Sequence, residues 1–192
     1  VYKRQAYASS TPVTKVKVGG TYSGFYYFDT SPDQEDWFHN FRATLNVSHA
    51  VSRRLQLGFN GWLAYEFQPD FAIGQTSSRV NDQYLYGYAN FSAAYSVTPL
   101  LTSVTNYTFS GVYYDEENFD DRITHRISQQ FKYLVSRLTA VTAEYRYSTT
   151  EYDRSVSDYN SHFALLGLNH AWSKQTTLSV AAGAQFVDCL LY

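Results

Sequence analysis

The sequence predicts an all-β fold, an antiparallel transmembrane β-barrel or a part of a larger one, and three observations support this. Long β-prone runs follow one another along the chain, short polar breaks alternate with longer polar segments, and apolar and polar residues alternate within the runs. A tilted strand that crosses a bilayer needs about 9 to 11 residues, whereas strands of soluble proteins usually have about 5 or 6. The runs meet the first requirement.

The composition fits such a fold. The chain has 192 residues, of which 44% are hydrophobic and 18% are aromatic, with 19 Tyr. Tyr suits a surface that is apolar in one part and wet in another. We interpret residues 1–192 as one β-barrel domain, or as an incomplete portion of a larger barrel.

Nine strands and a tenth at the N-terminus are expected in chain order, rich in Ser, Thr, Tyr, Phe and Val. Their expected ranges are Val1–Ala8, Val13–Phe28, Trp37–Ala50, Leu55–Phe67, Gln83–Ser96, Leu101–Tyr114, Arg122–Leu134, Leu138–Tyr152, Ser161–Trp172 and Thr177–Val187. Four short polar breaks between them predict tight hairpin turns. These breaks are Val51–Leu55, Val97–Leu100, Val135–Leu138 and Trp172–Gln175.

Alternation within the strands divides each one into an apolar and a polar side. In the segment Trp37–Ala50, Phe41 and Leu45 fall on one side and Arg42 falls on the other. The residues expected to face lipid are Phe41, Leu45, Leu57, Phe59, Val141, Tyr145, Val180 and Phe186. Two departures from this alternation are visible. Gln129 falls on the apolar side of its strand, and the alternating tyrosines from Tyr84 to Tyr88 fall on the polar side of theirs.

An Arg that faced lipid at mid-bilayer would cost about 2 to 4 kcal/mol, so charged residues within the strands are expected to line the lumen. The expected lumen-lining residues are Lys15, Lys17, Arg42, Arg122, Arg126, Lys132, Glu144 and Arg146. Such a lumen would concentrate anions. The alternative is that these are solvated wall residues, some of them paired with Glu66 or Glu144.

Charge also separates by end. Most of the 17 acidic residues lie in or beside the long polar segments, whereas the short turns carry Arg53, Arg54, Arg137 and Lys174. Outer-membrane barrels have short periplasmic turns and longer external loops. We therefore expect the acidic end to face outside, where lipopolysaccharide would be a partner. The last strand would run toward this end and place Tyr192 there.

No catalytic, cofactor or metal site is expected, and the protein is expected not to be an enzyme. The single Cys189 excludes an intrachain disulfide and a cysteine-based zinc cluster. The acidic segment Asp115–Asp121 lacks the EF-hand spacing, so a hydrated loop is preferred over a divalent-cation site. Ser161 and His162 are adjacent on a strand and must point to opposite faces, so they cannot form a nucleophile and its base. With a net charge of -2 and no basic stripe, nucleic acid is not an expected partner.

The short turns with Ser, Arg and Leu, together with the segment Ala143–Tyr147, make the chain resemble outer-membrane β-barrel porins, including the β-barrel porin 2 family. The resemblance covers nearly the whole chain and implies a barrel in the bacterial outer membrane and solute diffusion. It implies no residue-specific role.

Three functions are open at this point. The first is a porin-like channel for small hydrophilic solutes, which needs no cofactor. The second is a structural barrel that anchors or scaffolds partner proteins without conducting. For either barrel, the protein partners considered are barrel-associated proteins or further copies of the chain in a homo-oligomer. The third is a soluble β-sandwich that binds carbohydrate through exposed aromatic residues.

Overall fold

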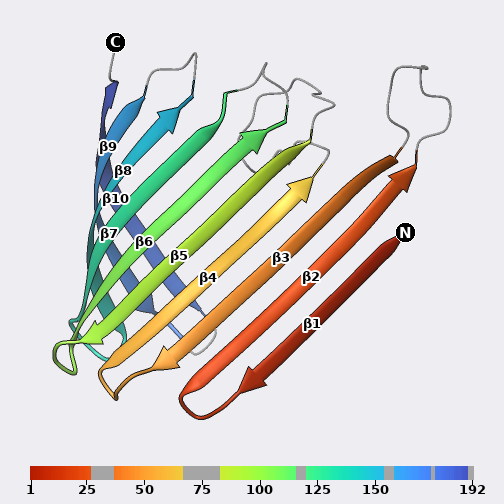
Figure 1. Cartoon of the computed structure of the whole chain (residues 1–192). Helices are drawn as coiled ribbons and strands as arrows, with labels where there is room; N and C mark the ends of the chain where they lie inside the picture. The colour runs from red at the N-terminus through yellow and green to blue at the C-terminus, as the bar shows by residue number, and fades with distance from the viewer. Residues whose placement is uncertain (27–36, 67–82, 116–119, 154–157, 174–175, 190–192) are drawn as a thin grey trace.

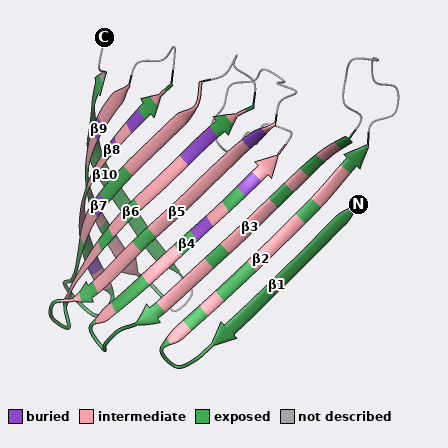
Figure 2. Ribbon diagram, viewed as in Figure 1, coloured by how far each residue is buried: buried purple, intermediate pink, exposed green. Residues whose placement is uncertain are grey.

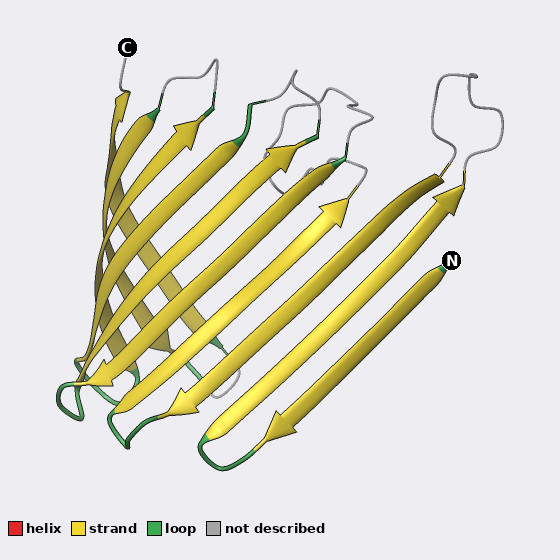
Figure 3. Ribbon diagram, in the orientation of Figure 1, coloured by secondary structure: helices red, strands yellow, loops and turns green. Residues whose placement is uncertain are grey.

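The computed structural model describes residues 1–26, 37–66, 83–115, 120–153, 158–173 and 176–189, and in these residues ten strands form one antiparallel sheet (Figures 1 and 3). The strands are β1 (Tyr2–Ser10), β2 (Thr14–Tyr26), β3 (Trp37–Ala50), β4 (Leu55–Glu66), β5 (Tyr84–Ser96), β6 (Leu101–Tyr114), β7 (Arg122–Leu134), β8 (Thr139–Tyr152), β9 (Tyr159–Ala171) and β10 (Thr177–Cys189). Each strand pairs with its neighbour in the sequence. The expected strands are confirmed, with ends that differ by at most a residue or two.

The strands are long and the sheet is curved. Apart from β1, which has 9 residues, each strand has 12 to 14. Figure 1 shows that β7–β10 turn behind β4–β6. Within the described residues β1 pairs only with β2 and β10 only with β9, so the sheet stays open. A single sheet does not fit the β-sandwich alternative, which is therefore wrong. No helix in the described part of the chain is long and apolar enough to cross a membrane.

The short turns share one local device, a Ser or Thr hydroxyl that caps the turn. The hydroxyl accepts a hydrogen bond from a backbone N–H two or three residues later, as Ser136 does from Leu138 at 3.2 Å and Ser52 from Leu55 at 3.0 Å. Thr98 accepts from Leu101 at 3.0 Å. Because these side chains satisfy backbone donors where the ladder stops, tight reversals need no longer loop. The same bond joins Thr11 to Thr14 at 2.9 Å, in a turn that was not singled out from the sequence.

The pairing register sorts side chains onto two faces, because directly paired residues of adjacent antiparallel strands share a face. We call the face that carries Arg42 the polar face and the face that carries Phe41 the apolar face. Arg42 pairs with Ala64, and Phe41 pairs with Tyr65.

Burial differs between these faces. Among the described residues the buried side chains are all on the polar face: Ala64, Tyr84, Val112, Ser128, Ala140, Ser148, Thr150 and Ser161. Side chains converge on the inner side of a curved sheet, so this crowding fits a polar face on the inside of the curve. Most exposed large apolar side chains within the strands are on the apolar face, whereas Tyr2, Phe25, Leu134 and Val187 are exceptions. Figure 2 shows that β1 is exposed along its length.

Close backbone packing between β9 and β10 requires a glycine. A Cβ added at Gly183 would clash with the carbonyl oxygen of Ala164 and lie 3.1 Å from the Cα of Leu165. Backbone atoms cannot move aside as the end of a side chain can. At Gly87 an added Cβ would make only an ordinary contact of 3.6 Å with Leu63.

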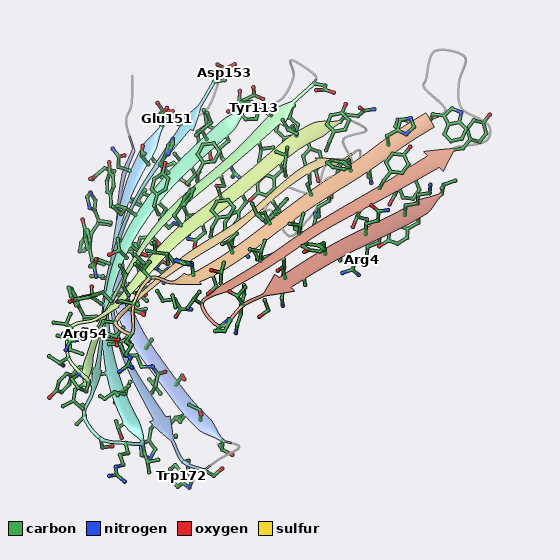
Figure 4. The ribbon with its side chains drawn as sticks, turned by 60° about the horizontal axis from the view of Figure 1, so that its bottom comes forward. Arg4, Arg54, Tyr113, Glu151, Asp153 and Trp172 are labelled. Atoms are coloured by element: carbon green, nitrogen blue, oxygen red, sulfur yellow. The ribbon has the colours of Figure 1, made fainter. Side chains whose placement is uncertain are left out.

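The chain direction agrees with the expected arrangement of short turns and longer connections. The N-terminus and the C-terminal end of β10 lie at the end of the sheet opposite the short turns (Figure 1). The strand β10 runs toward this end, as predicted, whereas Tyr192 lies outside the described residues. Glu151 and Asp153 lie at this end and Arg54 lies at the opposite end (Figure 4). The short turn with Arg54 and the acidic residues Glu151 and Asp153 are thus at opposite ends of the sheet.

Candidate functional site

The polar face carries a row of polar side chains that crosses the sheet from β2 to β9. Successive pairings place the following residues in this row: Lys17, Asn46, Asn60, Asn90, Thr108, Arg126, Ser148 and Ser161. Asn46 and Asn60 are hydrogen-bonded, Asn90 donates to the Thr108 hydroxyl at 2.8 Å, and the Ser148 and Ser161 hydroxyl oxygens are 2.8 Å apart. We call this set the central polar row. Its amides and hydroxyls can replace water around a hydrophilic solute.

A charged and aromatic cluster lies beside this row on β3–β5. The Arg42 guanidinium is 2.9 Å from Glu66 Oε1, and the Tyr84 hydroxyl donates to Glu66 Oε2 at 3.3 Å. The guanidinium also stacks over Trp62 at 4.7 Å, and the Trp62 and Tyr86 ring centroids are 4.4 Å apart. Arg42 is thus held by an ion pair with Glu66 and a cation–π contact with Trp62.

A second pair lies across the curve on β8. Arg146 donates to Glu144, and Gln130 donates to the other carboxylate oxygen of Glu144 at 3.2 Å. The guanidinium lies 5.1 Å from the centre of the Phe163 ring. The sequence alternative that some cations pair with Glu66 or Glu144 is confirmed for Arg42 and Arg146.

The other expected lumen-lining cations share the polar face. Lys15, Lys17, Arg122, Arg126 and Lys132 have its parity and have no acidic partner within 4.0 Å among the described residues. Arg4 on β1 was not among the expected lumen-lining residues, but it pairs with Thr21 and belongs to the same face. Since Glu66 and Glu144 are the acidic residues on this face of the described strands, the face carries an excess of positive charge.

Part of this charge surrounds a depression of about 650 Å³ at the β1 side of the sheet. Arg4, Lys17 and Arg42 line it from three successive strands, together with the Thr21 hydroxyl. Gly19 also lines it, on the same face of β2 between Lys17 and Thr21. The depression therefore combines cationic groups with hydroxyl donors.

The opposite, apolar face carries all of the residues expected to face lipid. The register places there Phe41, Leu45, Leu57, Phe59, Val141, Tyr145, Val180 and Phe186. Figure 4 shows side chains standing on both sides of the sheet. On β1, however, this parity is occupied by Lys3, Gln5, Tyr7 and Ser9, so the edge strand lacks an apolar stripe.

A polar island interrupts the apolar face on β6 and β7. The Gln129 amide nitrogen donates to the Ser103 hydroxyl at 2.8 Å, and the Thr105 hydroxyl donates to the Gln129 oxygen at 2.6 Å. This explains why Gln129 departed from the alternation in the sequence: its polar atoms are satisfied locally. Tyr84 and Tyr88, the other departure, lie on the polar face as their parity requires.

The described residues bring together no cluster of metal-ligating side chains. They contain no group of three or more His, Cys, Asp or Glu side chains that could hold a metal ion. Ser161 bonds Ser148 on the polar face, whereas His162 bonds Tyr145 on the apolar face, so these neighbours are separated by the sheet. The acidic segment considered for a cation lies mostly outside the described residues, at 116–119.

Comparisons with known proteins identify the fold. No family model matches the sequence, and a search of curated proteins gives no match. Among solved structures, a loop L8 deletion mutant of OmpT, an outer membrane protein of Vibrio cholerae, has a TM-score of 0.72 and 16% identity, covering 96% of this chain and 57% of that chain. In-vitro folded OmpT in a trimer form has a TM-score of 0.70 and 17% identity, covering 97% and 54%.

Outer-membrane expressed OmpT gives a TM-score of 0.69 at 17% identity, again covering 96% of this chain and 54% of the other. The chain therefore spans a little over half the length of these neighbours. At such identities the likeness concerns the fold, and the narrower resemblance to the β-barrel porin 2 family stays a prediction. The chain has the fold of a bacterial outer-membrane β-barrel protein.

Proposed function

We propose that this sheet is part of the closed wall of an outer-membrane channel through which small hydrophilic solutes diffuse. The observation that carries the proposal is the separation of the two faces, with the central polar row and its cations on one and large exposed apolar side chains on the other. A barrel wall places its polar face toward water and its apolar face toward lipid. Passive diffusion requires no cofactor, metal or catalytic group.

The unpaired edges of the sheet support the proposal that further strands close the wall. Unpaired backbone N–H and C=O groups cost several kcal/mol each in hydrocarbon, and β1 and β10 each have a neighbour on one side only in the described sheet. Further antiparallel strands would satisfy these groups. The trimer form of one structural neighbour also supports the prediction of a homo-oligomer.

The charge distribution further supports a preference for anions. Lys17 and Arg126 lie in the central polar row on β2 and β7, with four strands between them in the sheet. Their positive charges would lower the free energy of an anion at that level and raise that of a cation. Arg42 contributes less, because Glu66 lies beside it.

The test is conductance of the whole protein in planar bilayers, with the reversal potential measured across a KCl gradient. We expect open-channel conductance with a reversal potential on the anion-selective side. Neutralising both row cations, as Lys17→Gln with Arg126→Gln, should move the reversal potential toward zero. Arg137→Gln, in an exposed short turn, is the matched control and should leave it unchanged.

Two results would count against the proposal. Cation selectivity of the unmodified protein would exclude the anion preference but would still be consistent with a channel. No conductance from protein that is folded and inserted would favour the alternative of a structural barrel that anchors partner proteins.

A further inference from the structure

All five histidines lie on the apolar face, and each is hydrogen-bonded through Nδ1 to a hydroxyl on the neighbouring strand. The Tyr22, Tyr107 and Tyr145 hydroxyls hold three of the rings, and the Thr14 and Thr139 hydroxyls hold the other two. The pairs are Tyr22–His39 at 2.8 Å, Tyr107–His125 at 2.8 Å, Tyr145–His162 at 2.7 Å, Thr14–His49 at 2.7 Å and Thr139–His170 at 2.9 Å. One arrangement is thus repeated on separate parts of the sheet.

The pairs fall into two groups by position along the strands. The histidines of the three Tyr–His pairs are in the halves of their strands nearer the long connections, with Tyr107 and Tyr145 near the middle of β6 and β8. Both residues of each Thr–His pair are beside the short turns. Within β3, His39 belongs to the first group and His49 to the second. Within β9, His162 and His170 do the same. We call the two groups the tyrosine belt and the threonine belt.

The distance between the belts matches a membrane. His39 and His49 are ten positions apart in β3, which is about 33 Å along a strand at about 3.3 Å per residue. At a strand tilt of about 40°, this spans about 25 Å along the membrane normal, the height of the apolar band of an outer-membrane barrel. His162 and His170 are eight positions apart in β9 and span about 20 Å in the same way. The residues between them on the same face are Phe41, Ala43, Leu45 and Val47. The histidines therefore mark the borders of the apolar band.

At these borders each ring has one nitrogen left. Within the described residues, Nε2 of none of the five rings has a hydrogen-bond partner. When a hydroxyl donates to Nδ1, the ring carries its proton on Nε2, so that nitrogen is a donor. A donor at the boundary between hydrocarbon and water faces the layer in which lipid phosphates lie.

We propose that the two histidine belts are lipid-binding sites in which Nε2–H donates to lipid phosphate oxygens. The hydroxyl on the neighbouring strand fixes the ring orientation, as a carboxylate or carbonyl does for a metal-binding histidine. Parallel ring contacts add to this: the Tyr22 and His39 rings are 23° from parallel with centroids 6.0 Å apart, and Trp37 and His39 are 10° from parallel at 6.4 Å. The partner is thus a phosphate-bearing lipid surface at each border.

This inference rests on the same placement of the apolar face in lipid as the proposed function, but on different residues. The test is solid-state NMR of the whole protein, with histidine labelled in the ring with ¹⁵N, in phosphatidylglycerol bilayers. An Nε2–H···O–P bond places nitrogen and phosphorus about 4 Å apart, given a normal N···O distance of about 2.9 Å. We expect ³¹P dephasing of the Nε2 signals that clearly exceeds that of the Nδ1 signals.

Two sets of variants assign the signal to each border. In the double variant His49→Phe with His170→Phe, the labelled histidines that remain are those of the tyrosine belt. The dephasing in this variant therefore reports on the tyrosine-belt border. Adding Tyr22→Phe, Tyr107→Phe and Tyr145→Phe releases the three rings and should reduce the dephasing at least twofold, while the protein stays folded by circular dichroism. The converse variant, with His39, His125 and His162 changed to Phe, isolates the threonine belt.

Unchanged dephasing after loss of the three tyrosine hydroxyls would overturn the proposed role of the pairs. Nε2 signals without ³¹P dephasing in the unmodified protein would overturn lipid-phosphate binding. Contacts of the Phe41 ring with lipid acyl chains, measured in the same samples, separate this failure from failure of the proposed function. If Phe41 contacts the acyl chains and Nε2 does not contact phosphate, the proposed barrel wall is retained and the proposed lipid-phosphate sites are rejected.

Discussion

The assignment of the two faces can be tested by placing one charge on either side of a single strand. In β10, Ala181 and Ala182 are adjacent, both are exposed, and the register places Ala181 on the polar face and Ala182 on the apolar face. Ala182 pairs with Leu166, midway between the pairs that involve His162 and His170. The two sites thus share their original residue and nearly the same depth.

An Arg on the lipid side near mid-bilayer costs about 2 to 4 kcal/mol, whereas an Arg that reaches the water-filled side costs little. Ala182→Arg should therefore lower the folding equilibrium constant about 30-fold to 700-fold, since 1.4 kcal/mol is a factor of ten. Ala181→Arg should change it by about 0.5 kcal/mol or less, as substitutions at exposed sites usually do. The measurement is reversible denaturant unfolding of the protein in liposomes.

The comparison is informative because backbone propensity, side-chain volume and added charge are the same in both variants. Equal destabilisation by the two substitutions would show that both faces meet the same medium. Greater destabilisation by Ala181→Arg would invert the assignment. Either result would refute the reasoning from register and burial to a lipid side and a water side.

Two further predictions concern packing and the polar island. Gly183→Ala should destabilise the protein by about 1 to 3 kcal/mol, because backbone atoms block the new methyl group. In the same unfolding assay the control Gly87→Ala should be neutral or slightly stabilising. Equal effects of the two substitutions would contradict the close approach of β9 and β10. Gln129→Leu should lower the free energy of unfolding by about 1 to 2 kcal/mol, because it leaves the Ser103 and Thr105 hydroxyls unpaired. Adding Ser103→Ala and Thr105→Val should restore most of this stability. A triple variant less stable than the single one would contradict a lipid-facing island.

The strand plan was predictable because its signals are local. Period-two alternation in β3 and the Ser or Thr at each short turn specify strand, face and reversal within a few residues. Arg42 was assigned correctly to the polar face because strand parity needs no knowledge of the neighbouring strands. The same parity placed Tyr84 on that face although its ring is aromatic.

Contacts across strands were less predictable, because they depend on register between segments far apart in the sequence. The sequence raised Glu66 as a partner for some lumen cation, but it did not show that Arg42 also stacks on Trp62. Nor did it connect His125 with Tyr107, which lies on the preceding strand. A diagonal pair of this kind becomes visible only once β6 and β7 are aligned.

The polar island shows a different limit. Gln129 looked like a defect, because a single strand shows only that a polar side chain has an apolar parity. Ser103 and Thr105 on the adjacent strand supply its hydrogen bonds, so its cost in an apolar environment is reduced. A departure from alternation was therefore compensated by residues that alignment with β6 brings beside it.

The most direct test of a transmembrane wall is a cysteine scan of β3 in bilayers, with Cys189 replaced by Ser. The scanned positions run from Phe41 to Ser48. Cysteines at the even positions, from Arg42 to Ser48, should react with a water-soluble maleimide, and those at the odd positions, from Phe41 to Val47, should be protected and should contact lipid-borne quenchers when labelled. Uniform reactivity along the strand, or protection of the even positions, would contradict a wall with water on one side and lipid on the other.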